Sequence, residues 1–286
     1  MHNAQLSEKA AVDLEHPDVV RVHDYLLDGT AHWAVDREFG EALQKTIPEF
    51  KAITMASRMF VARVIRHLAK LGVRQFLDLG SGVLTAHNTH QIADDIDPHS
   101  RVVYVVKEPV ALAHAEILLD EEGDPDRHAV IRADLRDATT VLAQAQATEV
   151  FTPHDPVAVL MFSVLHILPP GSDGTDVVAA TVADYRRLLP SGSYLGVSHL
   201  TDDGIPPTFQ SKLVELQDLC ADWHSSGVFP RSRAQINALL GDFELVAPGM
   251  DWIPCWNPED ECPRVEPVVF DAPNHALLWG GLGRKA

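Results

Sequence analysis

Four groups of residues mark the ends of four apolar runs, at residues 75–79, 101–106, 129–133 and 157–162. They are Asp78 with the turn Gly80-Ser81-Gly82, then Glu108, then Asp134 with Leu135, and finally Ser163. Glycines at such a turn let the backbone bend tightly and let a ligand approach its N–H groups. A carboxylate after the second run can accept hydrogen bonds from both hydroxyls of a ribose, and one after the third suits the amino group of adenine. The four groups together predict a site for one adenosine-containing ligand, although each acid taken alone is better explained as a solvated loop residue.

The glycine turn differs from two familiar phosphate-binding turns. A dinucleotide-binding turn has a third glycine where this chain has Thr85, and a P-loop would continue into Gly-Lys-Ser/Thr. Asp78, two residues before the first glycine, fits a loop that hydrogen-bonds the amino-acid end of a nucleoside ligand. A dinucleotide oxidoreductase is therefore disfavoured, and a plain strand–helix turn without a ligand is the simplest alternative.

Two histidines follow later apolar runs and are candidate general bases. They are His166 and His199. A histidine ordinarily titrates near neutral pH and can take a proton from an attacking hydroxyl or amine. The alternative for His166 is that it only packs against the ligand or hydrogen-bonds to it.

The elements that must position these side chains alternate along the chain. Short apolar runs predict strands near residues 75–79, 101–106, 129–133, 157–162, 193–198, 244–247 and 276–281. Helical patterns lie between most of these runs, and three further helical patterns precede the first, ending at Gly72. Strands that alternate with helices predict an α/β fold with a mostly parallel, seven-stranded sheet.

Composition excludes several classes of protein. The chain has 286 residues, is 46% hydrophobic and carries a formal charge of −18, so it is globular, and its charge argues against the nucleic-acid backbone as main partner while leaving a local basic patch open. It contains no apolar run long enough to span a membrane and no secretory signal, which predicts a cytoplasmic protein without a membrane partner. Three cysteines, Cys220, Cys255 and Cys262, predict reduced thiols rather than a disulfide framework, and no metal site is expected.

The motifs resemble a known family. LDLGSG (77–82), the acid after the second strand and ADL (133–135) are similar to the class I S-adenosylmethionine-dependent methyltransferases. The whole chain resembles an actinobacterial group of S-adenosyl methyltransferase-like proteins, formerly a domain of unknown function. The likeness includes RVHDYLLDG (21–29), SVLHILP (163–169) and SYLGVSHLTDD (193–203).

This resemblance implies a Rossmann-like domain at residues 73–286 with a helical lid at 1–72, together forming one structural unit. It implies S-adenosylmethionine as cofactor, bound at the four groups above and also by Arg21, Tyr25 and Asn88, with Arg21 and Tyr25 approaching its methionine end. The expected activity is methylation of a small molecule, in secondary metabolism. Three tryptophans, Trp223, Trp252 and Trp256, either wall a substrate pocket or belong to the core.

The chain also departs from the family at the second strand. The family has an acid where this chain has Val106, and Lys107 adds a positive charge beside Glu108. Two alternatives therefore stay open: a repurposed fold that catalyses a cyclisation, rearrangement or elimination, or a ligand-binding protein without catalysis.

Overall fold

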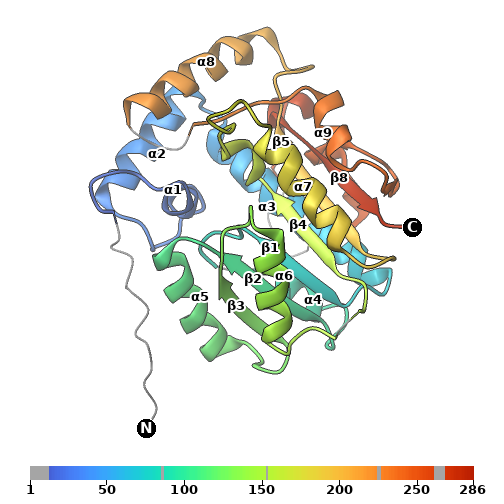
Figure 1. Ribbon diagram of the computed structural model, residues 1–286. Coiled ribbons are helices and arrows are strands. Elements are labelled where there is room, and N and C mark those ends of the chain that lie inside the picture. Colours follow the sequence, from blue (N-terminus) through green and yellow to red (C-terminus); the bar gives the residue numbers. More distant parts are fainter. Residues whose placement is uncertain (1–12, 85–86, 153, 224–226, 261–267) are drawn as a thin grey trace.

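The alternating apolar and helical segments fold into one twisted sheet with helices on both faces (Figure 1). The computed structural model describes residues 13–84, 87–152, 154–223, 227–260 and 268–286. Thr85 and Cys262, which entered the expectations above, lie outside these residues, as do residues 1–12 of the predicted lid.

The strands of the sheet are β1 Gln75–Leu79, β2 Arg101–Val106, β3 His128–Arg132, β4 Ala158–Phe162, β5 Tyr194–Leu200, β6 Glu244–Leu245, β7 Asp251–Trp252 and β8 Leu278–Arg284. Their order is β3-β2-β1-β4-β5-β8-β6, and β7 pairs with β8 off this path. The first five strands are parallel, whereas β8 runs antiparallel to β5, β6 and β7. The predicted mostly parallel α/β sheet is confirmed.

The sheet has eight strands rather than the seven expected. The additional strand, β7, is two residues long and pairs with Trp279 and Gly280 of β8. Two residues are too few to show the alternation of apolar and polar side chains that reveals a strand in a sequence.

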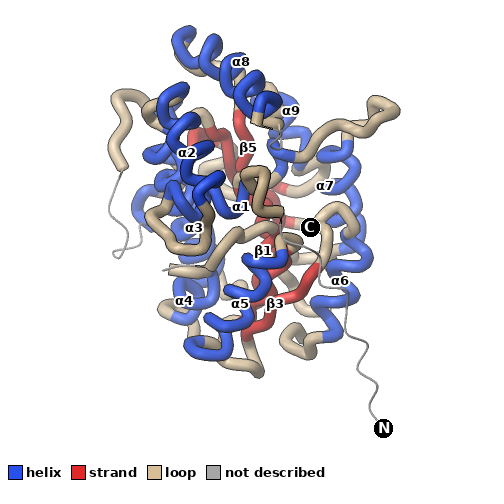
Figure 2. Tube along the Cα trace, turned by 90° about the vertical axis from the view of Figure 1, so that its left-hand side faces the viewer, coloured by secondary structure: helices blue, strands red, loops and turns tan. Residues whose placement is uncertain are grey.

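Helices cover the two faces of the sheet in separate groups (Figure 2). One face carries α3 Phe50–Lys70, α4 Thr89–Asp94 and α5 Pro109–Glu122, and the other carries α6 Ala138–Ala147, α7 Val177–Leu188 and α9 Arg233–Leu239. Outside α3 lie α1 Val19–Leu26, α2 Ala34–Thr46 and α8 Pro207–Asp222, at the top left of Figure 1. No helix of the described residues is long and apolar enough to cross a membrane.

The strands supply two apolar cores by simple alternation. Phe76 of β1 and Val102 of β2 belong to the core on the α3 side, whereas the next residues, Leu77 and Val103, belong to the core on the α7 side. All four are fully buried. Burial on both faces explains why apolar residues follow one another in these strands instead of alternating with polar ones.

The order of strands reverses between β1 and β4, because β2 and β3 lie on one side of β1 and β4 and β5 on the other. In open α/β sheets the crevice for ligands lies beyond the carboxyl ends of the strands at this reversal. The segments that follow β1, β2, β3 and β4 all meet there.

Candidate functional site

A cavity of about 820 Å³ lies at the carboxyl ends of β1 to β4 and is closed on one side by α1 and the segment before it. Most residues predicted to bind a cofactor line this cavity. They are Arg21, Asp78, Gly80, Ser81, Gly82, Asn88, Glu108, Asp134, Leu135 and Ser163. Tyr25, His166 and His199 do not line it.

The glycine turn after β1 forms part of the cavity wall. Gly80 and Gly82 both have left-handed backbone conformations, with φ of 76° and 74°. A Cβ atom on Gly80 would lie only 2.6 Å from a methyl carbon of Val164, whereas one on Gly82 would have no protein atom closer than 3.9 Å. Between them, the Ser81 hydroxyl oxygen is buried and has no hydrogen-bond partner among the described residues. The turn therefore needs Gly80 for its close approach to Val164 and presents Gly82 and Ser81 to a ligand.

A carboxylate and a guanidinium lie at the same end of the cavity as this turn. Asp78 is buried in β1, and its carboxylate accepts a hydrogen bond of 2.5 Å from the Thr89 hydroxyl. Burial raises the pKa of Asp78 to about 6, although Thr89 and the nearby charge of Arg58 oppose that rise. Arg58 comes from α3 and also lines the cavity. The two side chains have the charges needed to hold the ammonium and carboxylate groups of an amino acid.

Arg58 and its neighbour in the cavity, His23, also line the site but are not among the residues predicted to bind the cofactor. Burial lowers the pKa of His23 to about 4, and the charge of Arg58 contributes, so its imidazole is neutral at neutral pH. The sequence signal for Arg58 was its place in the N-terminal helical segment, which the family resemblance expects to cover the cofactor.

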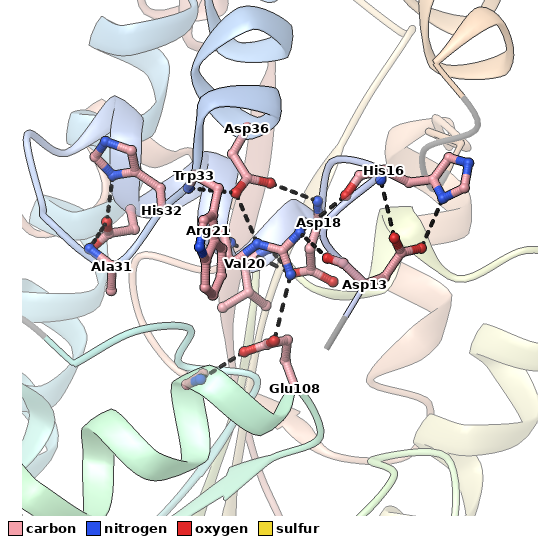
Figure 3. A network of polar contacts seen from close by, with 12 residues as sticks. Asp13, His16, Asp18, Val20, Arg21, Ala31, His32, Trp33, Asp36 and Glu108 are labelled. Carbon is pink, nitrogen blue, oxygen red and sulfur yellow. Dashed lines mark hydrogen bonds and ion pairs between the residues drawn. The ribbon is translucent and has the colours of Figure 1, made fainter. Parts of the chain in front are cut away.

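Glu108 stands at the second corner of the cavity and also caps α5. Its Oε2 accepts a hydrogen bond of 2.6 Å from the backbone N–H of Ala111. Its Oε1 lies 3.6 Å from Nη1 of Arg21 (Figure 3). Burial raises the pKa of Glu108 above its ordinary value.

Arg21 joins this corner to the N-terminal segment (Figure 3). Its Nε donates to the buried Asp36 at 2.8 Å, and its Nη2 donates to the backbone oxygens of Asp13 and His16, both at 3.0 Å. The guanidinium also stacks 4.8 Å from the ring centre of Trp33. Arg21 was expected near the methionine end of a cofactor, but it lies beside Glu108 and holds α1, α2 and residues 13–16 together.

Asp134 stands at the third corner with its acceptor positions occupied. Oδ1 accepts from the backbone N–H and the Nε of Arg136 at 3.0 and 2.9 Å, and Oδ2 accepts from Arg136 Nη2 at 2.6 Å and Lys107 Nζ at 3.0 Å. A carboxylate offers about four lone-pair positions, and these four hydrogen bonds use them all. The hydrogen bonds from Arg136, together with Lys107, hold the pKa of Asp134 far below its usual range.

The remaining predicted residues are arranged as follows. Asn88 caps α4. The backbone oxygen of Leu135 accepts from the Tyr185 hydroxyl at 3.0 Å. The Ser163 hydroxyl lies 2.7 Å from the Ser57 hydroxyl. Ser163 itself has a left-handed backbone conformation, with φ of 54°.

His199 points away from the cavity because of strand alternation. It shares a face of β5 with Leu195 and Val197, which belong to the core on the α7 side, whereas Ser198 faces Ser163. His199 Nδ1 donates to the backbone oxygen of Leu200 at 2.8 Å. His166 lies in a short 3-10 helix, Leu165–Ile167, and its Nδ1 accepts from the Leu200 N–H at 3.4 Å. The 3-10 helix directs the His166 ring toward His199, with 5.7 Å between the two ring centres.

Tyr25 packs between α1 and α2 instead of facing the cavity. A Cβ atom on Gly40 of α2 would lie 2.4 Å from its ring, and His32 meets it edge-on. The three tryptophans also stay out of the cavity lining, and Trp256 is fully buried in the core. The described part of the chain contains no group of three or more His, Cys, Asp or Glu residues that could hold a metal ion.

Comparison with known proteins identifies the family. A model of the S-adenosyl methyltransferase family matches residues 5–286. The chain belongs to this family. It is similar in structure to a methyltransferase-like protein from Thermobifida fusca, with 34% identity, a TM-score of 0.82 and coverage of 96% of both chains. It is also similar to a DUF574 family protein from Streptomyces avermitilis, with 27% identity, a TM-score of 0.84 and coverage of 96% of this chain and 100% of that one.

More distant structures share the fold. The mitomycin 7-O-methyltransferase MmcR is 18% identical over 93% of this chain and 68% of its own, and PigF with SAH (S-adenosylhomocysteine) is 16% identical over 88% and 69%; both have a TM-score of 0.50. A search of curated protein sequences finds no match. The methyltransferase family and the Rossmann-like fold expected from the sequence are confirmed.

Proposed function

We propose that the cavity binds S-adenosylmethionine and that the protein transfers its methyl group to a small molecule. The observation that carries this proposal is the order of groups along the cavity. Asp78 and Arg58 stand beside the glycine turn, Glu108 stands next, and the segment with Asp134 and Leu135 stands last. This order follows that of an amino acid, a ribose and an adenine in one ligand.

The residues present fit such a ligand. The orphaned Ser81 hydroxyl and the open position above Gly82 leave polar groups for it at the turn. The bound sulfonium would supply the activated methyl group, so the protein has mainly to bind, orient and exclude water. We assign exclusion of water to the helical lid within residues 1–72, where Arg21 fastens α1 and residues 13–16 over Glu108.

Proton removal is needed only when the acceptor is a protonated hydroxyl or amine. His166 and His199 would have to turn from their present hydrogen bonds to serve as the base. His23 already lines the cavity and is neutral at neutral pH, so we propose it as the first candidate.

A small-molecule acceptor is supported by the size of the cavity and by the likeness to a mitomycin methyltransferase. The same likeness supports a place in secondary metabolism, and we expect the protein to act in the cytoplasm, without a nucleic-acid or membrane partner. The charge of −18 gives no support for a nucleic-acid substrate.

Calorimetric titration with S-adenosylhomocysteine and S-adenosylmethionine tests the proposal. We expect binding in the micromolar range by wild type and strong loss in Asp78→Asn. As a matched control, Asp242→Asn removes one carboxylate of an exposed ion pair with Arg186 and should bind like wild type. Folded protein that binds neither ligand at millimolar concentration would overturn the proposal.

A repurposed fold is the second candidate, and Val106 with Lys107 favours it. Val106 is buried and cannot accept a hydrogen bond from a ribose. Formation of S-adenosylhomocysteine in step with a methylated product would exclude this second candidate. Cofactor binding without such turnover over a wide range of acceptors would instead support a ligand-binding protein without catalysis.

A further inference from the structure

Three cationic side chains gather at the adenine end of the cavity. Lys107 follows β2, Arg132 is the last residue of β3, and Arg136 lies in the loop after it. Arg132 is paired in register with Val106, the residue before Lys107, so Arg132 and Lys107 lie at the ends of neighbouring strands. Lys107 and Arg136 share a single carboxylate, Asp134.

This corner is more positive than the rest of the cavity. Among the described lining residues there are five Lys or Arg and five Asp or Glu, although the whole chain has 23 against 41. Asp18 and Glu108 contribute to the field at Arg21, and Asp78 contributes to that at Arg58. Among the described lining residues at the adenine end, three cationic side chains stand against one carboxylate, Asp134.

The carboxylate that commonly holds a ribose at the end of the second strand is absent. Val106 occupies that position and is buried. In nucleotide sites of this topology, an acid there selects free ribose hydroxyls, whereas a nearby basic residue accommodates a phosphate on the ribose. Lys107 and Arg132 have the charge and position for the second arrangement, and Arg132 is exposed.

From these observations we propose that the corner formed by Lys107, Arg132 and Arg136 binds a phosphate ester on the 2′ or 3′ oxygen of an adenosine ligand. The placement of the adenosine rests on the proposed function, because the ribose must lie near Glu108 for its substituents to face this corner. The guanidinium groups would bind the phosphate through charge-assisted hydrogen bonds.

Calorimetry with adenosine and its 2′-, 3′- and 5′-monophosphates, at one fixed ionic strength, tests the proposal. We expect the 2′- or the 3′-monophosphate to bind about tenfold more tightly than adenosine, because a phosphate at an exposed cationic corner gains roughly one to two charge-assisted hydrogen bonds. The 5′-monophosphate serves as the control for charge alone, since its phosphate is attached to the side of the ribose that would face the glycine turn, away from the three cations.

Variants locate the effect. Arg132→Ala and Lys107→Met should each lower the ratio of phosphate-ester affinity to adenosine affinity by about fivefold. Arg187→Ala is the matched control, since Arg187 is an exposed arginine on α7 outside the cavity lining, and it should leave the ratio unchanged. Melting temperatures measured for each variant exclude a loss of folded protein.

Equal affinities for adenosine and its 2′- and 3′-monophosphates would overturn the proposal, and so would a preference that survives both substitutions. Parallel titration with S-adenosylhomocysteine separates this failure from failure of the proposed function. Binding of S-adenosylhomocysteine with no gain from a phosphate removes only the phosphate corner. A phosphate-dependent gain without binding of S-adenosylhomocysteine removes only the methyltransferase proposal for this cavity.

Discussion

The two ends of the cavity are built differently. At the end with the glycine turn, Asp78 is buried, accepts one side-chain hydrogen bond, and has its pKa raised to about 6 by burial. At the end proposed to hold the adenine, Asp134 is part-exposed, accepts four hydrogen bonds, and has its pKa held far below the usual range by Arg136 and Lys107. Both ends place an acid at the carboxyl end of a parallel strand or just beyond it.

Asp78 has acceptor positions left for a cationic ligand group, whereas Asp134 is already paired with two cations, Lys107 and Arg136. A buried carboxylate with spare acceptor positions gains much from a ligand cation, because the desolvation cost has already been met in the folded protein. A carboxylate saturated by neighbours can bind a ligand only by exchanging one hydrogen bond for another. We therefore expect the affinity for S-adenosylhomocysteine to depend strongly on the first end and weakly on the second.

The largest effect is expected for Asp78→Asn. Removing this charge leaves the ligand ammonium without its buried counter-ion, which should cost about 3 kcal/mol, or about a hundredfold in the Kd of S-adenosylhomocysteine. In the free protein, loss of the desolvated carboxylate stabilises the fold and loss of the counter-charge of the buried Arg58 destabilises it, so we expect only a small change in melting temperature at pH 7. Calorimetry and a melting curve measure both. An unchanged Kd would show that Asp78 does not meet the ligand.

The pH dependence of binding should report the same carboxylate. The ligand prefers ionised Asp78, and burial holds its pKa at about 6 in the free protein. Affinity should thus be flat above pH 7 and fall about tenfold for each unit well below pH 6, as the proton competes. His23, with its pKa at about 4, stays neutral through most of this range. Titrations of Asp78→Asn provide the control, and persistence of the slope in that variant would assign the dependence to another group.

A smaller effect is expected for Glu108→Ala, about tenfold in the Kd of S-adenosylhomocysteine. The ribose hydroxyls lose a charged acceptor, but Oε2 is shared with the N–H of Ala111 and Oε1 faces Arg21. A 2′,3′-dideoxy analogue should lose less than twofold. Glu108→Gln is the matched control, because it preserves the size of the side chain and an acceptor for the helix cap. Equal losses for both ligands would place the ribose elsewhere.

The sequence was sufficient to place the backbone of this site, because strand ends and glycine turns depend on local patterns. It could not place side chains whose direction depends on neighbours. His199 was expected on the cavity side, but strand alternation assigns it to the opposite face together with Leu195 and Val197. The ring of His166 follows the 3-10 helix after Ser163, and no spacing in the sequence reveals that turn.

Long charged side chains were equally hidden. Lys107 was read as a neighbour of Glu108, yet its Nζ crosses to Asp134 on the next strand end. Arg58 comes to Asp78 from α3, which lies in a different part of the chain. These two pairs join distant segments, whereas Arg136 reaches Asp134 from two residues along the same loop through the conformation of that loop. Neither arrangement can be deduced from spacing, and therefore only the folded structure reveals that Asp134 is saturated while Asp78 is available.

The smallest effect is expected for Asp134→Ala, less than threefold in the Kd of S-adenosylhomocysteine. All four acceptor positions of this carboxylate are occupied by Lys107 and Arg136, so an adenine amino group would only replace a hydrogen bond already made. Lys107→Met should instead free one position on Oδ2 and tighten binding about two- to threefold. The analogue with inosine in place of adenosine lacks the amino group and should not share that gain. A tenfold loss in Asp134→Ala that is absent for the inosine analogue would show that Asp134 leaves its cations for the adenine, and the two ends of the cavity would then bind by the same means.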